Sequence, residues 1–283
     1  MKYELRCRPI KHQLICADHD KPTNNKLKKI LLDAYPAQGH VNAMIRLADE
    51  MIKFDYECVF VGYPFFKELV ESSGHGYYDI DSFHLVPVGI EIKKKKWIQF
   101  LIENIQEHRN IRLKKQYDKS RLEYDSLIDK ICPDIVFVDD HYSDKLLFYN
   151  KYNVLVVNVM TTVPPDFDRL VPCFSDETLP SPKFMAKVKM RLSWWLTYVE
   201  RDFYRQANKF LCLGETNLKF LCERSYNKNI TVEWNRCLGI GFKGFTNIST
   251  TFKQFDFQRE ITKKNVYYLG RTIDLNIRFS VMT

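Results

Sequence analysis

The hydrophobic and polar positions of the chain alternate between short apolar runs and longer stretches with a helical period. The first apolar run covers residues 29–35 and predicts a β-strand. In the stretch that follows, apolar side chains recur every three or four residues: Met44, Leu47, Ala48, Met51 and Ile52. This spacing predicts one buried face of a helix that begins at Val41. A second apolar run at residues 57–62 completes a β-α-β unit, whose right-handed crossover makes its two strands parallel.

The same alternation continues along most of the chain. Further helices are predicted at residues 64–74, 97–131 and 184–207, and further strands at 133–140, 154–160, 210–214 and 266–270. The connection at residues 161–182 holds five prolines, so we expect it to run extended over the surface. Strands that alternate with helices are typical of an α/β fold, and we predict a doubly wound, Rossmann-like parallel sheet.

The charge pattern adds one candidate binding region. Basic residues outnumber acidic ones by 43 to 35, and their densest cluster is residues 93–96, followed by residues 109–115. A run of this kind is usually the solvated face of a helix, so we expect no nucleic-acid partner. Contact of this region with an anionic membrane surface stays open as an alternative.

The cysteines and the N-terminal residues indicate in which cellular compartment the protein is expected. The eight cysteines show no paired or regular spacing, which argues against a zinc site and against a disulfide framework. No apolar run approaches the roughly 18–20 residues of a membrane span. Residues 1–28 lack the apolar core of a signal peptide. We therefore expect a cytoplasmic protein without a bound metal.

The first candidate for chemistry is His40, in the sequence Gly39-His40-Val41-Asn42 directly after the first predicted strand. Loops at the carboxyl ends of parallel strands form the ligand-binding edge of open α/β sheets. A histidine on a short turn at that edge is well placed to act as a general base. Two other histidines, His75 and His141, lie next to predicted loops, and we interpret both as incidental.

Five segments occur in an order that resembles a known family: residues 38–42, 56–61, 65–74, 133–139 and 266–270. Together they resemble the acceptor half of the UDP-glycosyltransferase and macrolide-glycosyltransferase group, whose members have the two-domain GT-B fold. The resemblance covers residues 29–274 and implies a single N-terminal half of a GT-B fold. It makes residues 1–28 a polar extension and residues 275–283 the start of a linker, with the donor-binding domain absent.

The resemblance also implies roles for particular residues. His40 takes the proton from an acceptor hydroxyl, and Asp139, at the end of a later strand, holds the imidazole; Asp140 is the alternative partner. The residues implied in acceptor binding are Gly39, Asn42, Phe65, Asp140 and Thr161. The family reaction inverts the anomeric carbon and requires no cofactor or metal. Its partners are a small hydroxylated acceptor and a nucleotide-sugar, here a UDP-sugar, bound by a missing or separate domain.

Three functions remain open at this point. The first is an acceptor domain for hexosyl transfer that is inactive or very weak as an isolated chain, since stabilisation of the departing diphosphate comes from the other half. The second is a non-catalytic or regulatory partner in a split glycosyltransferase. The third is an oxidoreductase using the GxGxxG pattern at residues 239–244, although the β-branched residues after it favour a glycine-rich turn between strands. Trp194 and Trp195 either line an acceptor cleft or form a packed helix face.

Overall fold

The computed structural model describes residues 28–80, 112–152, 154–168, 170–173, 181, 183–210, 231–233, 241–251, 256 and 266–269. Several predicted features lie outside these residues. They are the extension at residues 1–27, the basic cluster at residues 93–96, the run at residues 211–214 and the linker at residues 275–283.

The centre of the fold is a seven-stranded sheet with the order β3-β2-β1-β4-β5-β8-β9, in which every neighbouring pair is parallel. Its strands are β1 (Lys28–Asp33), β2 (Tyr56–Gly62), β3 (Gly76–Asp79), β4 (Ile135–Asp139), β5 (Leu155–Met160), β8 (Thr246–Ser249) and β9 (Val266–Tyr268). A separate antiparallel pair consists of β6 (Thr231–Glu233) and β7 (Gly241–Lys243). The predicted α/β class and parallel, doubly wound sheet are confirmed.

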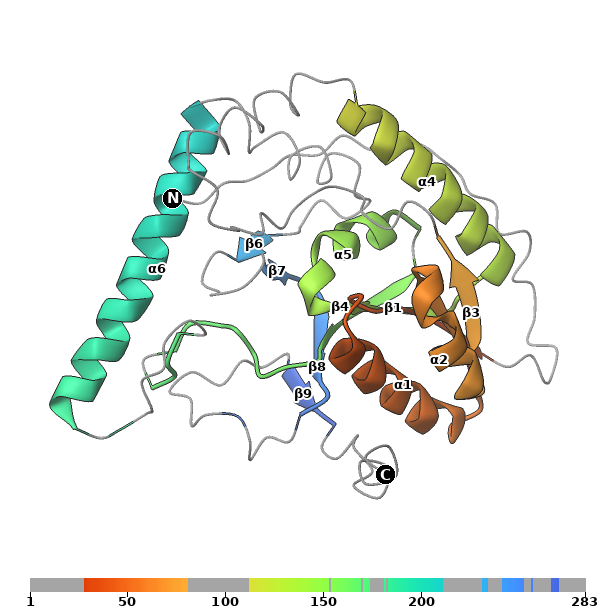
Figure 1. The fold of residues 1–283 in the computed structure, drawn as a ribbon, viewed down its shortest axis with the longest axis horizontal. Coiled ribbons are helices and arrows are strands. Elements are labelled where there is room, and N and C mark those ends of the chain that lie inside the picture. The colour runs from red at the N-terminus through yellow and green to blue at the C-terminus, as the bar shows by residue number, and fades with distance from the viewer. Residues whose placement is uncertain are drawn as a thin grey trace.

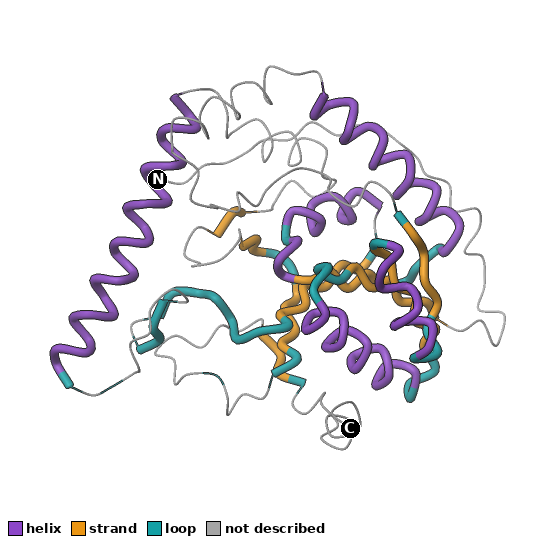
Figure 2. The backbone as a smooth tube through the Cα atoms, in the orientation of Figure 1, coloured by secondary structure: helices purple, strands orange, loops and turns teal. Residues whose placement is uncertain are grey.

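Helices cover both faces of the sheet (Figures 1 and 2). One layer consists of α1 (Gln38–Ile52) and α2 (Lys67–Ser72), and the other of α4 (Arg112–Ile131) and α5 (Asp144–Tyr149). Three short 3-10 helices are η1 (Pro64–Phe66), η2 (Asp140–Tyr142) and η3 (Asn150–Tyr152). The long α6 (Phe184–Phe210) lies along the edge of the molecule in Figure 1. None of the helices that the structure describes combines the length and apolar character needed to cross a membrane.

The hydrophobic core is divided by the sheet, because successive side chains of a strand point to opposite faces. Ile30 and Leu32 of β1 belong to a buried cluster that includes Met44 of α1. Leu31, between them, belongs to a second buried cluster that includes Tyr124 of α4. Burial on both faces explains why the central strands appear in the sequence as continuous apolar runs.

Three features differ from the expectations. The apolar pattern does not predict β3 or β8, which the sheet includes. The connection after β5 is not confined to the surface, since Pro164, Pro165 and Asp166 are buried. Proline has no N–H group, so these two residues can be buried without an unpaired donor. The strand predicted at residues 210–214 does not begin at Phe210, which is the last residue of α6.

The glycine pattern does not form a dinucleotide-binding loop. Gly241 lies in β7, and Gly244 adopts φ +102° in the turn that leads into β8. A dinucleotide fingerprint requires a helix that opens on the glycines, and a strand follows here instead. The structure therefore does not support a dinucleotide-binding loop at residues 241–244, while the glycine-rich turn between strands is confirmed for residues 241–249.

A buried ion pair that the sequence does not predict lies beneath the end of β1. Lys145 Nζ is 2.7 Å from Asp33 Oδ1 and 3.0 Å from Oδ2, and Tyr149 donates a hydrogen bond of 2.7 Å to Oδ2. Both charged side chains have 1% exposure or less. Burial raises the pKa of Asp33, and the charge and hydrogen bonds of Lys145 oppose that shift.

We predict that the Lys145→Met variant is destabilised by about 3–5 kcal/mol, because it leaves the Asp33 carboxylate buried without its cation. Urea unfolding measures the loss. The double variant Asp33→Asn/Lys145→Met should be more stable than Lys145→Met alone, since it carries no buried charge at this position.

The pH dependence gives a second check on the same variant. Without Lys145, the pKa of Asp33 rises further, so the folded state binds this proton more tightly than the unfolded state does. The deficit of Lys145→Met relative to the wild type should therefore shrink as the pH falls from neutral toward about 4, the ordinary carboxyl pKa. A deficit that stays constant or grows over this range would contradict the assignment.

Candidate functional site

The candidate site lies where the chain turns in opposite directions beyond two neighbouring strands. After β1 the chain enters α1 on one face of the sheet, and after β4 it enters α5 on the other (Figure 1). β1 and β4 are paired in parallel, with Asp33 opposite Val138. The carboxyl ends of two such strands form a topological switch point, where open α/β sheets bind ligands.

His40 reaches this point from the first turn of α1. Ala37 has extended backbone dihedral angles (φ −131°, ψ 139°), and its carbonyl oxygen accepts hydrogen bonds from the N–H groups of His40 and Val41 at 2.9 and 3.0 Å. The helix therefore begins at Gln38 and not at Val41 as expected. This corrects the description of His40 as a loop residue: helical hydrogen bonding fixes its backbone, which limits where its ring can lie.

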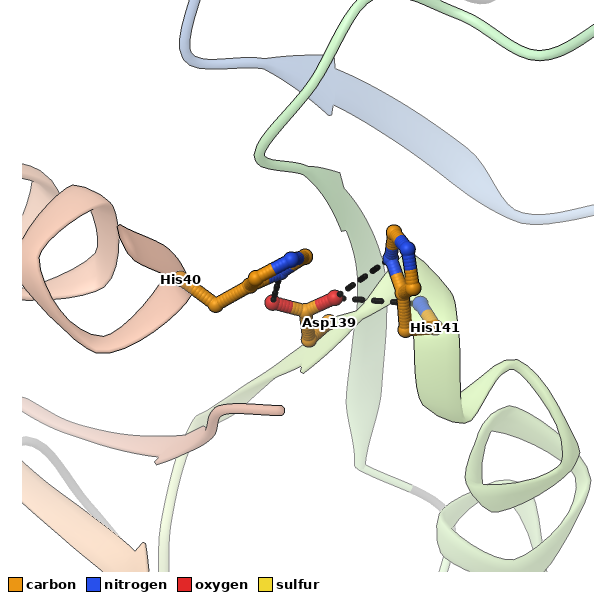
Figure 3. Close-up of side chains that lie close together, drawn as sticks. All are labelled: His40, Asp139 and His141. Atoms are coloured by element: carbon orange, nitrogen blue, oxygen red, sulfur yellow. Dashed lines mark hydrogen bonds and ion pairs between the residues drawn. The ribbon is translucent and has the colours of Figure 1, made fainter. Parts of the chain in front are cut away.

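Asp139, the last residue of β4, binds two histidines through its two carboxylate oxygens (Figure 3). Oδ2 lies 2.9 Å from His40 Nδ1. Oδ1 accepts a hydrogen bond of 3.0 Å from the backbone N–H of His141 and lies 3.5 Å from His141 Nδ1. The structure thus brings His40 and Asp139 together, as the resemblance implies, and adds His141 to them.

The surroundings of Asp139 keep its carboxylate ionised. Its side chain has no exposure to solvent, and this burial alone would raise its pKa. Hydrogen bonds from His141 and His40, together with the charge of His40, outweigh burial and lower the pKa of Asp139 below its ordinary value.

Thr161, the residue after β5, completes the ring of donors around Asp139. Its hydroxyl Oγ1 lies 2.6 Å from His40 Nδ1 and donates to Asp139 Oδ2 at 3.4 Å. An ionised carboxylate can only accept, so the contact at 2.9 Å assigns the hydrogen of neutral His40 to Nδ1, where it lies between Asp139 Oδ2 and Thr161 Oγ1. Neutral His40 then has its lone pair on Nε2, which makes no hydrogen bond within the part of the chain that the structure describes.

Aromatic rings surround the two histidines. The rings of His40 and His141 meet edge to face with centroids 4.4 Å apart. The ring of Tyr35 lies 5.1 Å from each of them and 5.1 Å from that of Tyr142. His141 therefore lies beside the same carboxylate as His40, a contact that its interpretation as incidental does not anticipate. The signal for it is its position two residues after Asp139, in the turn that follows a buried strand.

The remaining residues that the resemblance implies have different surroundings. Gly39 and Asn42 are exposed beside His40 in the first turn of α1. Asp140 is buried and accepts a hydrogen bond of 2.7 Å from Asn158 Nδ2. Phe65 of η1 is 66% exposed, and its ring stacks on that of Tyr63. No hydrogen bond or ring contact found among the described residues joins Asp140 or Phe65 to His40.

Trp194 holds the segment after Thr161 against α6. Its side chain is 1% exposed, its indole N–H donates a hydrogen bond of 2.7 Å to the carbonyl oxygen of Val171, and its ring meets that of Phe167 edge to face. Trp194 thus belongs to a packed helix face. Trp195, in contrast, is 57% exposed.

The two histidines and the aspartate at the switch point could also hold a metal ion. His40, Asp139 and His141 each offer one ligand atom, and these atoms lie within 4.8 Å of one another. His75, the other described histidine, is buried and pairs with Asp49 of α1 at 3.0 Å.

Comparison with known proteins gives a partial likeness in fold. No protein-family model matches the chain, and no curated protein sequence matches it. Similar solved structures include the calicheamicin glycosyltransferase CalG4 (TM-score 0.46, 14% identity, 88% of this chain) and the spinosyn forosaminyltransferase SpnP (TM-score 0.42, 14% identity, 88% of this chain). The spinosyn rhamnosyltransferase SpnG is similar over 48% of this chain, with a TM-score of 0.34 and 16% identity. The matches cover 53%, 52% and 36% of the length of these structures, respectively. At these sequence identities and TM-scores, the likeness is one of fold and says nothing about the activity of this chain.

The role of Thr161 in the site can be tested through stability. Thr161→Val removes the hydroxyl that donates to Asp139 while keeping the shape of the side chain, and we expect it to cost roughly 1–3 kcal/mol of unfolding free energy. Thr161→Ser keeps the hydroxyl and is the matched control. Equal unfolding midpoints for the Val and Ser variants in urea would show that the hydroxyl does not stabilise the carboxylate.

Proposed function

We propose that the site is the acceptor side of a glycosyltransferase, in which His40 is the general base for an acceptor hydroxyl. The observation that carries the proposal is the contact of 2.9 Å between His40 Nδ1 and the ionised, buried carboxylate of Asp139. This contact fixes the tautomer that leaves Nε2 as the acceptor of a proton. The reaction class is inferred from the five sequence segments that resemble the UDP-glycosyltransferase group.

The proposed reaction is a single displacement that inverts the anomeric carbon. The acceptor oxygen forms a bond to that carbon as its proton moves to His40 Nε2. The bond from the anomeric carbon to the phosphate oxygen breaks, and the nucleoside diphosphate leaves with the electron pair. Asp139 stabilises the imidazolium ion that forms, because its negative charge lies against Nδ1–H.

The donor side of the proposed reaction is a UDP-sugar held by a separate domain, which transfers a hexosyl group. The proposed acceptor is a small hydroxylated molecule at the switch point, contacted by Gly39, Asn42, Phe65, Asp140 and Thr161. Without a donor domain we expect little or no turnover, because stabilisation of the departing diphosphate is missing. We also propose a cytoplasmic location, which is supported by the free thiols of Cys58, Cys132 and Cys173 in the described part of the chain.

The proposal is tested in a chimaera that joins residues 1–283 to the donor-binding half of a two-domain glycosyltransferase. The assay contains UDP-glucose and simple phenols, and mass spectrometry detects the glycoside. His40→Ala should lower turnover by about 10²- to 10⁴-fold, the range for loss of a general base. Lys53→Ala is the control, since Lys53 caps the far end of the same helix and is exposed.

Three outcomes would contradict the proposal or a part of it. Turnover by His40→Ala equal to that of Lys53→Ala would place the base elsewhere. A folded chimaera that transfers no sugar to any phenol would favour a non-catalytic partner of a split glycosyltransferase. Robust turnover by residues 1–283 alone would overturn the expected need for a second domain.

A further inference from the structure

We propose that His40, Asp139 and His141 form a binding site for a first-row transition-metal ion, and that Zn²⁺ is its natural class of ligand. The site goes beyond the proposed glycosyl transfer, which requires no metal. Two imidazoles and one carboxylate are the donor set of many zinc sites in which three protein groups bind the ion and one position remains open. Imidazole nitrogen also disfavours Mg²⁺ and Ca²⁺, which prefer oxygen ligands.

The donor atoms lie close enough together to approach a common ion, since one ligand atom from each of the three residues lies within 4.8 Å of the others. Ligands bound at about 2.0–2.1 Å around one ion lie about 2.9–3.4 Å apart, for angles between the octahedral and tetrahedral values. His40 Nδ1 lies 2.9 Å from Asp139 Oδ2, and His141 Nδ1 lies 3.5 Å from Asp139 Oδ1. An ion bound by all three residues would draw the donor atoms from these separations to those of a single coordination shell.

The backbone and burial favour such a site. Asp139 ends a central strand and has a fully buried side chain, so its carboxylate has a fixed position. The side chains of His40 and His141 are 16% and 28% exposed, which gives an ion an approach from solvent. The Thr161 hydroxyl lies 3.4 Å from Asp139 Oδ2, where it can orient the ligating carboxylate as an outer hydrogen bond.

The charges of the residues around Asp139 also allow a metal cation to bind there. Lys145 is a buried cation next to the site, with its ammonium group 4.3 Å from the ring centre of Tyr142. Asp33 forms a direct ion pair with it at 2.7 Å. Asp33 thus provides the counter-charge of Lys145, while the carboxylate of Asp139 lies against the rings of His40 and His141.

Metal binding and the general base would exclude each other. Coordination of an ion through Nδ1 of His40 requires the hydrogen on that nitrogen to move to Nε2. His40 would then present an N–H group to the acceptor instead of a lone pair. Bound Zn²⁺ would thus hold the site in a form that cannot accept a proton from a hydroxyl.

The experiment is a calorimetric titration of the full chain, without an affinity tag, with ZnCl₂ alone. Compared with the wild type, His141→Ala and His40→Ala should each lose one equivalent of Zn²⁺ binding or weaken it at least tenfold. Cys132→Ser is the control, because Cys132 is an exposed thiol between α4 and the first residue of β4, at the other end of the strand from Asp139, and its replacement should leave that equivalent unchanged. Zinc sites formed by other histidines or cysteines would persist in all four proteins.

Circular dichroism and urea unfolding without metal show whether each variant is folded, and His141→Gln replaces His141→Ala if the latter is not. Titration curves of the two histidine variants that coincide with the wild type would overturn the proposal, and so would a wild type that binds no Zn²⁺. The result is independent of the glycosyl-transfer assay. Zinc binding can be lost in a protein that still transfers sugar, and it can persist in one that does not.

Discussion

The buried carboxylate of Asp139 is the group on which the arrangement of the site depends. A carboxylate without solvent contact is stable only if donors surround it. Its donors here come from three residues: the ring of His40 in α1, the backbone N–H of His141, and the hydroxyl of Thr161 after β5. His141 follows Asp139 by two positions, whereas His40 and Thr161 lie 99 and 22 positions from it and are placed beside it by the order of the strands. The local chemistry of the site is therefore a consequence of the topology of the whole sheet.

A second buried group, the ion pair of Lys145 with Asp33, stabilises the same region. Lys145 contacts the ring of Tyr142 through its ammonium group while pairing with Asp33 at the end of β1. Tyr142 in turn packs against Tyr35, whose ring lies beside both histidines. The two charged groups at the switch point, Asp33 and Asp139, thus have different partners and different roles. Asp33 connects β1 to α5, and Asp139 orients the two imidazoles.

The sequence predicts the parts of the fold that follow from continuous burial. β1, β2, β4 and β5 appear as apolar runs because their side chains are buried on both faces. β3 is missed because it is a short edge strand with only partly buried side chains. β8 gives no apolar run because Thr246–Ser249 is polar, so the sequence indicates it only as the strand after the glycine-rich turn and not as a member of the sheet.

The site is predictable only in part, for a related reason. His40 and Asp139 follow from motifs, and their contact follows from the neighbouring positions of β1 and β4. His141 is missed because the direction of a side chain in a turn depends on backbone hydrogen bonds, such as that from its N–H to Asp139. Lys145 is missed because lysine is almost never fully buried, and the carboxylate that pairs with it lies 112 positions away.

The central claim is that Asp139 holds His40 through Nδ1–H and leaves the lone pair on Nε2. Nitrogen-15 NMR of histidine-labelled protein, free of metal and near neutral pH, measures this directly, because protonated and unprotonated ring nitrogens have different chemical shifts. We predict that neutral His40 carries its hydrogen on Nδ1 and that this preference is lost in Asp139→Ala. Neutral His40 with its hydrogen on Nε2 in the wild type would contradict the claim.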